Sequence, residues 1–305
     1  MAATSGSITV IINPMAGSLV TDDEIRRRSG LAAEVIAAHG ERADVYVTSG
    51  QGEGLERARD AVAAGSRLVI AWGGDGTVNE VAAAVAFGPA ALAIVPAGSG
   101  NGLARDLRID PDPARALAAA LEAPERTIDA GELGGRLFVN VAGVGFDAHV
   151  ARRFNARGPN ARRGLATYAG LVLRESFAYA PATYALTADG ASLGRHRAFF
   201  VTLANSSQFG NGVRVAPAAR IDDGRLDLVV FAPPSRMAGL WRACGMLAGG
   251  LTAGADVRMI PVREVAIEGA TPLWFHVDGE SVLGGQCLVG RVHPRAVRIR
   301  SADRG

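Results

Sequence analysis

The chain has 305 residues, 49% of which are hydrophobic, with a formal net charge of +2 and only two cysteines. This length and apolar content predict two domains, or one large domain, with a full core. The near-neutral charge gives no indication of nucleic acid as a partner. Cys244 and Cys287 lie too far apart for a metal-ligand motif, so we expect them to be buried free thiols in a reducing cytosol.

The first 128 residues alternate short apolar runs with segments of helical periodicity. We predict strands at residues 8–12, 43–47, 68–72 and 91–95, and helices at 22–39, 53–64, 77–86 and 112–121. Such alternation is typical of a doubly wound α/β domain with a mainly parallel sheet. Ligands of these sheets bind beyond the carboxyl ends of the strands. The small, polar loops at 13–17, at Thr48, at 73–77 and at 98–101 follow those ends and would form a nucleotide-sized mouth.

The most informative loop joins the apolar run 68–72 to the helical stretch that starts at Thr77. Its three glycines allow a tight turn and close approach of a ligand, and a helix N-terminus offers N–H groups to phosphate. The chain has no Lys, so the loop is not a Walker A motif. The carboxylate of Asp75 would repel a bare phosphate, so we expect it to order a metal-bound water or to hydrogen-bond the loop. A plain Gly-rich turn capped by Asp75 is an alternative of equal weight.

Beyond about Thr127, short apolar runs recur without regular crossover helices, which predicts an antiparallel β domain. We expect its strands at 137–142, 183–188, 198–204, 226–231, 262–267, 273–277 and 296–299, and helices at about 147–157, 161–177 and 234–251. The first seven residues lack the pattern of a signal peptide. The apolar stretch 81–98 is broken by Gly88-Pro89, so we expect a soluble protein.

Six motifs in fixed order resemble those of the diacylglycerol kinase catalytic-domain family, which includes bacterial lipid kinases, sphingosine kinases and ceramide kinases. They are Asn13-Pro14-x-Ala16-Gly17, Gly73-Gly74-Asp75-Gly76-Thr77-x-Asn79-Glu80, Pro96-x-Gly98-Ser99-x-Asn101, Gly143-x-Gly145-Phe146-Asp147-Ala148, Ala216-Pro217-x-Ala219-x-Ile221-Asp222-Asp223-Gly224-x-Leu226-Asp227 and Asp278-Gly279-Glu280. The resemblance implies an α/β nucleotide-binding domain at 1–128, similar to that of NAD kinases. It also implies a β-sandwich lipid-substrate domain at 129–300, a tail at 301–305 and an active site in the cleft between the domains.

The same resemblance implies roles for individual residues. Glu280 would be the general base on the lipid hydroxyl, and Asp75 would also be catalytic. Mg²⁺ would be held by the carboxylate of Asp223 and by backbone oxygens of Arg220 and Arg225. The residues implied to bind ATP are Asn13, Thr48, Gly73, Gly74, Asp75, Gly76, Thr77, Asn79, Ser99, Asn101 and Arg105.

From the residues alone, three of these sites have simpler interpretations. Glu280 could be a solvated hairpin acid, Asp222-Asp223-Gly224 a plain β-turn, and Arg105 a surface helix charge. The third motif also departs from the pattern of many bacterial members, because Gly102 stands where they have an acid. Its Gly-Ser-Gly-Asn sequence is more similar to the sphingosine kinase branch, which leaves the identity of the lipid open.

The resemblance therefore implies an ATP- and Mg²⁺-dependent kinase that phosphorylates a hydroxyl of a diacylglycerol-like or sphingoid lipid. A kinase of the same superfamily acting on a soluble substrate such as NAD is one alternative, and a non-catalytic nucleotide- or lipid-binding protein is another. We expect a cytoplasmic protein that associates peripherally with the membrane, with residues 152–163 as one region of contact. No nucleic acid partner is expected, and a homodimer is left open.

Overall fold

The structure, a computed structural model, describes residues 7–17, 21–50, 52–156 and 165–301. Two compact units divide the chain: unit 1 comprises Met1–Ile128 and Arg295–Gly305, and unit 2 comprises Asp129–Pro294. The chain passes from one unit to the other within strands β5 (Glu125–Leu133) and β16 (Cys287–Arg300). The second domain was expected to run to residue 300, whereas the segment from Arg295 onward belongs to unit 1.

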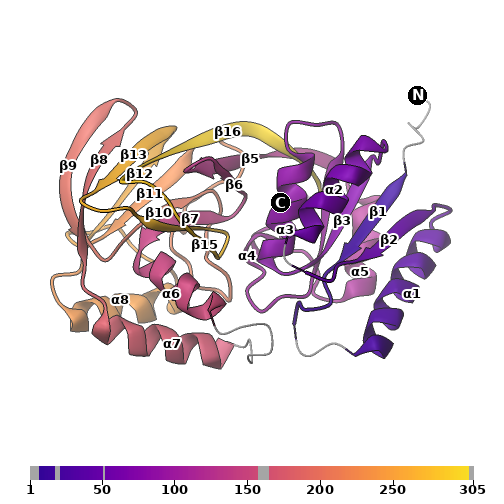
Figure 1. The fold of residues 1–305 in the computed structure, drawn as a ribbon, viewed down its shortest axis with the longest axis horizontal. Helices are drawn as coiled ribbons and strands as arrows, with labels where there is room; N and C mark the ends of the chain where they lie inside the picture. Colours follow the sequence, from indigo (N-terminus) through magenta and orange to yellow (C-terminus); the bar gives the residue numbers. More distant parts are fainter. Residues whose placement is uncertain (1–6, 18–20, 51, 157–164, 302–305) are drawn as a thin grey trace. The chain divides into compact units, whose positions relative to one another are not determined.

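A parallel sheet forms the centre of unit 1 (Figure 1). Its strands follow the order β2 (Ala43–Val47), β1 (Ile8–Ile12), β3 (Leu68–Gly73) and β4 (Ala91–Pro96). Both β1 and β3 are buried along their whole length, as their unbroken apolar sequences require of strands covered on both faces. The end of β16 pairs in parallel with β4, with Arg298 opposite Ala91, and this pairing draws the C-terminal segment into unit 1.

The helices of unit 1 pack on the sheet in two pairs, α1 with α5 and α2 with α3, and the short α4 follows β4. Their bounds are α1 (Asp22–Ala38), α2 (Glu53–Ala63), α3 (Asp75–Val85), α4 (Gly102–Asp106) and α5 (Pro113–Glu122). The parallel sheet with helices on both faces confirms the predicted α/β class. Helix α3 starts two residues before the expected Thr77, so Asp75 lies in its first turn.

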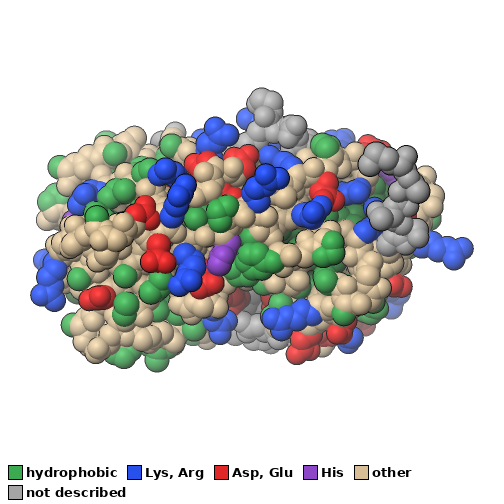
Figure 2. Space-filling model, turned by 90° about the horizontal axis from the view of Figure 1, so that it is seen from above, with side chains coloured by type: hydrophobic (Ala, Val, Ile, Leu, Met, Phe, Trp, Pro, Cys, Tyr) green, Lys and Arg blue, Asp and Glu red, His purple; other side chains and the backbone are tan. Residues whose placement is uncertain are grey.

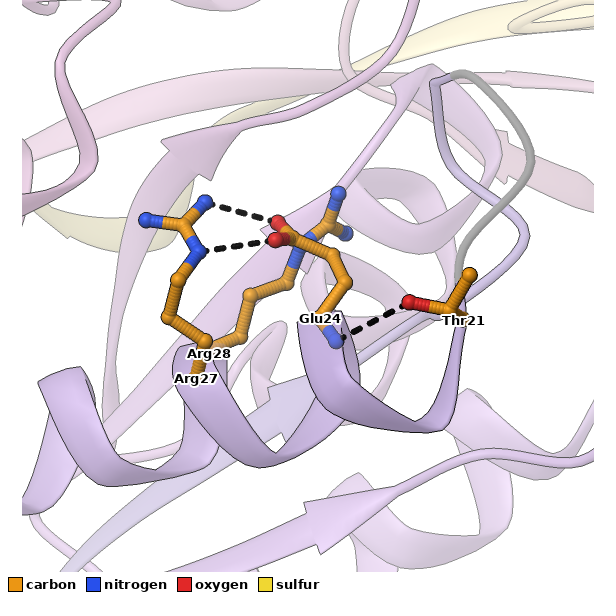
Figure 3. A network of polar contacts seen from close by, with 4 residues as sticks. All are labelled: Thr21, Glu24, Arg27 and Arg28. Carbon is orange, nitrogen blue, oxygen red and sulfur yellow. Dashed lines mark hydrogen bonds and ion pairs between the residues drawn. The ribbon is translucent and has the colours of Figure 1, made fainter.

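A network of polar contacts fixes the start of α1 (Figure 3). The Thr21 hydroxyl accepts a hydrogen bond from the Glu24 N–H at 3.3 Å and so caps the helix. The Glu24 carboxylate accepts from Arg27 Nε at 2.7 Å and from Arg28 Nε at 3.0 Å, one turn further along. Hydrogen bonds from Arg27, followed by those from Arg28, lower the pKa of Glu24 to about 2.

Unit 2 contains two antiparallel sheets that share one apolar core. One sheet has the order β12-β11-β10-β7-β14-β15. In the other, β16, β13, β8 and β9 follow one another, β5 pairs with β16, and β6 pairs with β5. The strands not yet bounded are β6 (Arg136–Phe138), β7 (Val141–Gly145), β8 (Ala182–Ala188), β9 (Ala191–Ala198), β10 (Phe200–Ala204), β11 (Leu226–Phe231), β12 (Val257–Val262), β13 (Glu264–Gly269), β14 (Trp274–Val277) and β15 (Glu280–Leu283). Inward side chains of both sheets, among them Leu203, Val265 and Phe275, form the core. The predicted β-sandwich is confirmed.

Helices α6 (Phe146–Asn155), α7 (Leu165–Ala178) and α8 (Arg236–Ala248) complete unit 2 and lie together below its strands (Figure 1). They correspond to the three helical segments expected from the sequence, apart from residues 157–164, which lie outside the described residues. Within the described part of the chain, no helix is both long and apolar enough to span a bilayer.

Two expectations about the surface can be compared with the structure. Cys287 is exposed, so the expectation that it is buried was wrong: it alternates with the buried Leu288 along β16 and faces outward. The side chain of Cys244 lies outside the described part. On the face seen in Figure 2, basic and acidic side chains are interspersed with apolar ones, in keeping with the net charge of +2.

Candidate functional site

The turn between β3 and α3 has room only for glycine at its first position. A Cβ on Gly73 would lie 2.4 Å from Thr77 Oγ1, so the Thr77 side chain occupies the space above it. The Thr77 hydroxyl in turn accepts a hydrogen bond from Asn13 Nδ2 at 2.9 Å. Gly74 is the N-cap of α3 in an extended conformation and has no side chain with which to cap the helix. The first N–H groups of α3 therefore receive no side-chain cap from this position.

A second Gly-rich loop, after β4, packs directly against this turn. A Cβ on Gly98 would lie 2.6 Å from Gly74 Cα and 2.9 Å from Asn101 Oδ1. The loop after β1 reaches the same place, because a Cβ on Gly17 would lie 2.9 Å from the carbonyl oxygen of Ala97. The absence of side chains at these glycines is therefore what lets three loops meet at the carboxyl edge of the sheet.

Asp75 binds the second Gly-rich loop. Its carboxylate accepts hydrogen bonds from the Asn101 N–H at 2.9 Å and from the Gly102 N–H at 2.7 Å. Asn101 itself has a φ of 51°, and its side chain bonds to both the N–H and the carbonyl of Gly98. We expected Asp75 to order a metal-bound water or to hydrogen-bond its own loop; the bonds to Asn101 and Gly102 join it to the neighbouring loop after β4. The same bonds cap α4, which has no side-chain cap of its own.

Two further residues predicted to bind ATP, Thr48 and Arg105, differ in their surroundings. Thr48 follows β2, but its side chain is buried and its hydroxyl is 3.4 Å from the carbonyl of Ile12. Arg105 lies on α4 and donates from Nε to the Gly100 carbonyl at 3.0 Å. A cavity of about 210 Å³ borders Arg105 and Asn101, with lining residues Pro96, Asn101, Ala104, Arg105, Ile109 and Pro111. Asn13, the Gly73–Thr77 turn and Asn101 are thus brought together within unit 1.

Glu80, the last residue of the second motif, has a defined position as well. Its Oε1 accepts from the Gly52 N–H at 2.9 Å, at the start of α2. Its Oε2 lies so close to Gly54 that a Cβ there would be 2.2 Å away. Glu80 therefore ties α2 to α3, and the small residues Gly52 and Gly54 make the contact feasible.

In unit 2, the Asp-Gly-Glu motif forms the tight turn between β14 and β15. Asp278 and Gly279 both have positive φ, 47° and 89°, and Val277 pairs with Glu280 across the turn. Positive φ at both central positions is the geometry that an Asp-Gly pair favours in a two-residue hairpin. Glu280 is the first residue of β15 and is partly exposed.

Asp278 fixes this turn to the neighbouring strand. Its carboxylate is buried and accepts hydrogen bonds from three successive backbone N–H groups, those of Val139, Asn140 and Val141, at 2.9–3.0 Å. A carboxylate with several N–H donors is strongly held. The side chain of Asn155 on α6 adds a bond from Nδ2 to the Gly279 carbonyl at 3.0 Å.

A buried polar cluster lies beside the turn. The Gly279 N–H donates to His276 Nδ1 at 3.4 Å. His276 Nε2 lies 3.3 Å from Asp147 Oδ2, within ion-pair distance but outside hydrogen-bond geometry. Asp147 also accepts from the Thr202 hydroxyl at 2.8 Å. A side chain at Gly143 would displace this carboxylate, since a Cβ there would lie 2.3 Å from Asp147 Oδ2.

The predicted Mg²⁺ turn, Arg220 to Arg225, precedes β11. Asp223 is exposed, and its carboxylate accepts from the Arg225 N–H at 3.0 Å. Burial raises the pKa of Asp227, and the negative charge of Asp223 raises it further, so two carboxylates lie close enough to repel each other. Among the described residues no cluster of three or more His, Cys, Asp or Glu side chains could hold a metal. The predicted site has one carboxylate and two backbone oxygens, so it would not count as such a cluster of side chains.

Sequence reasoning did not identify Asp129 as part of this region. Asp129 is fully buried on β5; its N–H donates to the Ile221 carbonyl and its Oδ2 accepts from the Gly224 N–H, both at 2.6 Å. It therefore fixes the Asp223 turn from a strand almost a hundred residues earlier in the chain. The signal that could have indicated it was an acid between two apolar residues of a strand, Ile128-Asp129-Ala130.

Each of the two units matches a known protein family. A family model described as the diacylglycerol kinase catalytic domain matches residues 7–133, and one described as the YegS C-terminal NAD kinase beta sandwich-like domain matches residues 140–301. The chain belongs to the diacylglycerol kinase catalytic-domain family. The resemblance stated from the six motifs is thereby confirmed.

Members of the diacylglycerol kinase family match the chain over most of their length. A protein of Pseudomonas aeruginosa PAO1 named probable lipid kinase YegS-like is 35% identical, over 93% of this chain and 91% of its own. A protein of the same name from Pseudomonas fluorescens Pf-5 is 32% identical, over 93% and 92%. A crystal structure of a diacylglycerol kinase from Bacillus anthracis strain Sterne has a TM-score of 0.73 at 19% identity, covering 97% of this chain and 96% of that one. That last similarity concerns the fold.

Proposed function

We propose that the protein is an ATP- and Mg²⁺-dependent lipid kinase that transfers the γ-phosphate of ATP to a hydroxyl of a diacylglycerol-like or sphingoid lipid. The observation that carries this proposal is the contact of two Gly-rich loops at Gly74 and Gly98, bridged by Asp75. It supports an anion-binding turn in a chain whose relatives are named as lipid kinases. Asp75, in this proposal, acts by holding the turn in place.

The nucleotide would bind at the carboxyl edge of the parallel sheet in unit 1. The N-terminus of α3 offers N–H groups and a partial positive charge to phosphate oxygens. Backbone approaches this close need glycine, and the sequence has it at each point of contact. The chain lacks the lysine that a Walker A loop uses, so Arg105 at the edge of the 210 Å³ cavity is the cation assigned to the phosphates.

The turn before β11 suits a hard divalent cation. Asp223 supplies a carboxylate, and the repulsion between Asp223 and Asp227 would be relieved by a positive charge. Backbone oxygens of Arg220 and Arg225 would complete the protein ligands. When bound, Mg²⁺ neutralises charge that would otherwise oppose phosphoryl transfer. The contribution of the chain itself is the turn, which Asp129 fixes through Gly224.

Glu280 is the proposed general base. A lipid hydroxyl is a weak nucleophile, and a carboxylate that accepts its proton while the oxygen bonds to the γ-phosphorus makes the attack feasible. The hairpin supports this function because Asp278 and Gly279 fix the backbone immediately before Glu280. The proposal requires the γ-phosphate of ATP bound to unit 1 to come within reach of Glu280.

The test is transfer of label from γ-labelled ATP to a panel of acceptors in mixed micelles: diacylglycerol, sphingosine, and NAD as the soluble competitor. Labelled lipid, lost on chelation of Mg²⁺ and restored by its addition, is the expected result. Labelled NAD in the absence of labelled lipid would favour the soluble-substrate kinase. Tight ATP binding with no transfer to any acceptor would favour a non-catalytic protein.

A finer test concerns the metal. Asp223→Asn should raise the Mg²⁺ concentration needed for half-maximal activity, because the cation would lose its one charged ligand. Asp222→Asn, the adjacent exposed acid, is the matched control and should leave that concentration unchanged. An equal shift in both variants would indicate a general effect of surface charge and remove Asp223 from the proposed site.

We also propose a cytoplasmic protein that works at a membrane surface, because the acceptor lipid resides in a bilayer.

A further inference from the structure

Large apolar side chains on α7 and α8 of unit 2 are exposed to solvent. Leu173 and Phe177 on α7 are 48% and 50% exposed, and Met237 and Trp241 on α8 are 68% and 81% exposed. The two residues of each helix are four positions apart and so share one face of it. The helices contact each other, and Figure 1 shows them side by side. We refer to these four residues as the α7–α8 patch.

The other sides of both helices are anchored in unit 2. On α7, the buried Glu175 accepts from His149 Nε2 at 2.7 Å. On α8, Arg242 donates from Nη2 to Asp256 Oδ1 at 2.6 Å and from Nε to Oδ2 at 3.1 Å, and Met246 is buried in the core. The α7–α8 patch therefore contributes little to the core, and its exposure needs another explanation.

The charge of the two helices is one-sided. Their sequences contain Arg174, Arg236 and Arg242 but a single acid, Glu175, which is buried. Arg242 is paired with Asp256, and Arg174 Nε lies 3.8 Å from Glu175 Oε1. The Arg174 side chain is 85% exposed, next to Leu173. The chain as a whole balances its charges, with 32 basic and 30 acidic residues. An apolar surface beside the exposed Arg174, with no exposed acid in the sequence of either helix, complements a surface that is apolar inside and negatively charged outside.

We propose that the α7–α8 patch docks unit 2 onto an anionic lipid surface. Trp241 and Phe177 enter the boundary between headgroups and acyl chains, where aromatic rings are favoured, and Arg174 meets lipid phosphates. This rests on the proposed function only in that a lipid kinase must reach a substrate inside a bilayer. The region expected from the sequence, residues 152–163, is adjacent in the chain, but residues 157–163 lie outside the described part.

Binding to vesicles tests the proposal without any turnover. Wild-type protein should cosediment with vesicles containing phosphatidylglycerol and bind pure phosphatidylcholine vesicles several-fold more weakly. The double variant F177E/W241E should bind the anionic vesicles at least about tenfold more weakly, because two charged groups replace the inserting side chains. Phe87→Glu is the matched control: Phe87 is 66% exposed but lies in unit 1, so binding should not change.

Tryptophan fluorescence reports the contact directly. Trp72 is 1% exposed and Trp274 38%, so Trp241 is the residue whose emission should shift to the blue on adding anionic vesicles. Trp241→Phe should abolish the shift while keeping most of the binding, since an aromatic ring is retained. Arg174→Gln should weaken binding to anionic vesicles and reduce its dependence on salt, because one headgroup contact is lost.

Three outcomes of the binding measurements would overturn the proposal. The first is undiminished vesicle binding by F177E/W241E. The second is an unchanged emission spectrum when wild-type protein is bound to vesicles. The third is a wild-type dimer that the double variant converts to a monomer, with vesicle binding retained, since the patch would then be a subunit interface. A protein that binds vesicles but has no kinase activity would contradict the proposed function alone. A double variant that phosphorylates vesicle lipid at the wild-type rate would contradict the docking surface alone.

Discussion

Gly74 and Gly98 pack backbone against backbone, so closely that a Cβ on Gly98 would lie 2.6 Å from Gly74 Cα. Neither partner is a flexible side chain that could move aside. The two Gly-rich loops of unit 1 thus depend on each other for their shape, and the candidate nucleotide site is a property of the pair.

Gly98→Ala should therefore separate the two loops. We expect ATP affinity to fall by about tenfold or more, since misplacing the anion-binding turn costs more than one hydrogen bond. Gly50→Ala is the control, because a Cβ at that loop glycine meets nothing within 4 Å and the backbone there is not left-handed. Titration calorimetry with ATP distinguishes the two, and equal affinities would remove the loop contact from the site.

Asp75→Asn tests the bridge between the loops. An amide has one acceptor oxygen, so it can satisfy only one of the Asn101 and Gly102 N–H groups and turns its NH₂ toward the other. The free energy of unfolding should fall by about 1.5–3 kcal/mol, the usual contribution of a charge-assisted bond, and ATP binding should weaken with it. Asp44→Asn, on an exposed position of β2, should change neither. A stability equal to wild type in urea denaturation would contradict the bridging function.

Glu280→Gln tests the general base. The variant keeps the size of the side chain but cannot accept a proton, so kcat should fall by about 10²–10⁴-fold while ATP affinity stays near that of wild type. Glu268→Gln, an exposed acid on β13, serves as the control. Weakened ATP binding with an unchanged kcat would exclude Glu280 as the base.

Asp278→Asn tests how the hairpin is held. Three backbone N–H groups converge on its carboxylate, and an amide cannot accept from all of them while its own NH₂ points at one. Unit 2 should lose about 2 kcal/mol of stability, and kcat should fall because Glu280 is no longer fixed. Normal stability together with normal kcat would mean that the turn is held by β14 and β15 alone.

The Glu24 network predicts a dependence on pH. The pKa of Glu24 is lowered from 4.5 to about 2, so its contribution to stability is fully present above about pH 4.5 and is lost as the pH falls toward 2. Glu24→Gln should lower Tm slightly at pH 7, because exposed ion pairs contribute little. The difference from wild type should shrink between pH 4.5 and 2 in thermal melts. A constant difference over that range would assign the effect to the helix start at Thr21 instead.

The sequence predicted unit 1 well because β1, β3 and β4 are apolar and buried and each is followed by a small, polar loop. It predicted unit 2 less completely. β9 is largely exposed and polar, Ala191–Ala198 with two Arg and a His, so no alternation marks it; it forms because β8 pairs with it. β12 was missed because Pro261 interrupts it, although the position lies on a strand at the end of its sheet, where proline is tolerated.

The candidate site, too, could be predicted from the sequence only in part. Local motifs located Asp75, Asp223 and Glu280, since glycines and turn residues surround each one. What the motifs could not indicate is which partner satisfies each acid. The bonds of Asp75 to Asn101 and of Asp129 to Gly224 join residues that are 26 and 95 positions apart. Such pairings are set by the tertiary fold, so they cannot be predicted from sequence spacing.

The return of β16 to unit 1 has a consequence for biosynthesis. The strand that pairs with β4, through Arg298 and Ile299, is synthesised some two hundred residues after its partner. Until then β4 presents an open sheet edge, a known template for aggregation. Unit 2 can complete its core before the end of β16 has been synthesised and has paired with β4 in unit 1. A nascent chain arrested before residue 295 should therefore be sensitive to protease at β4, and chaperones that bind open edges should associate with it longest.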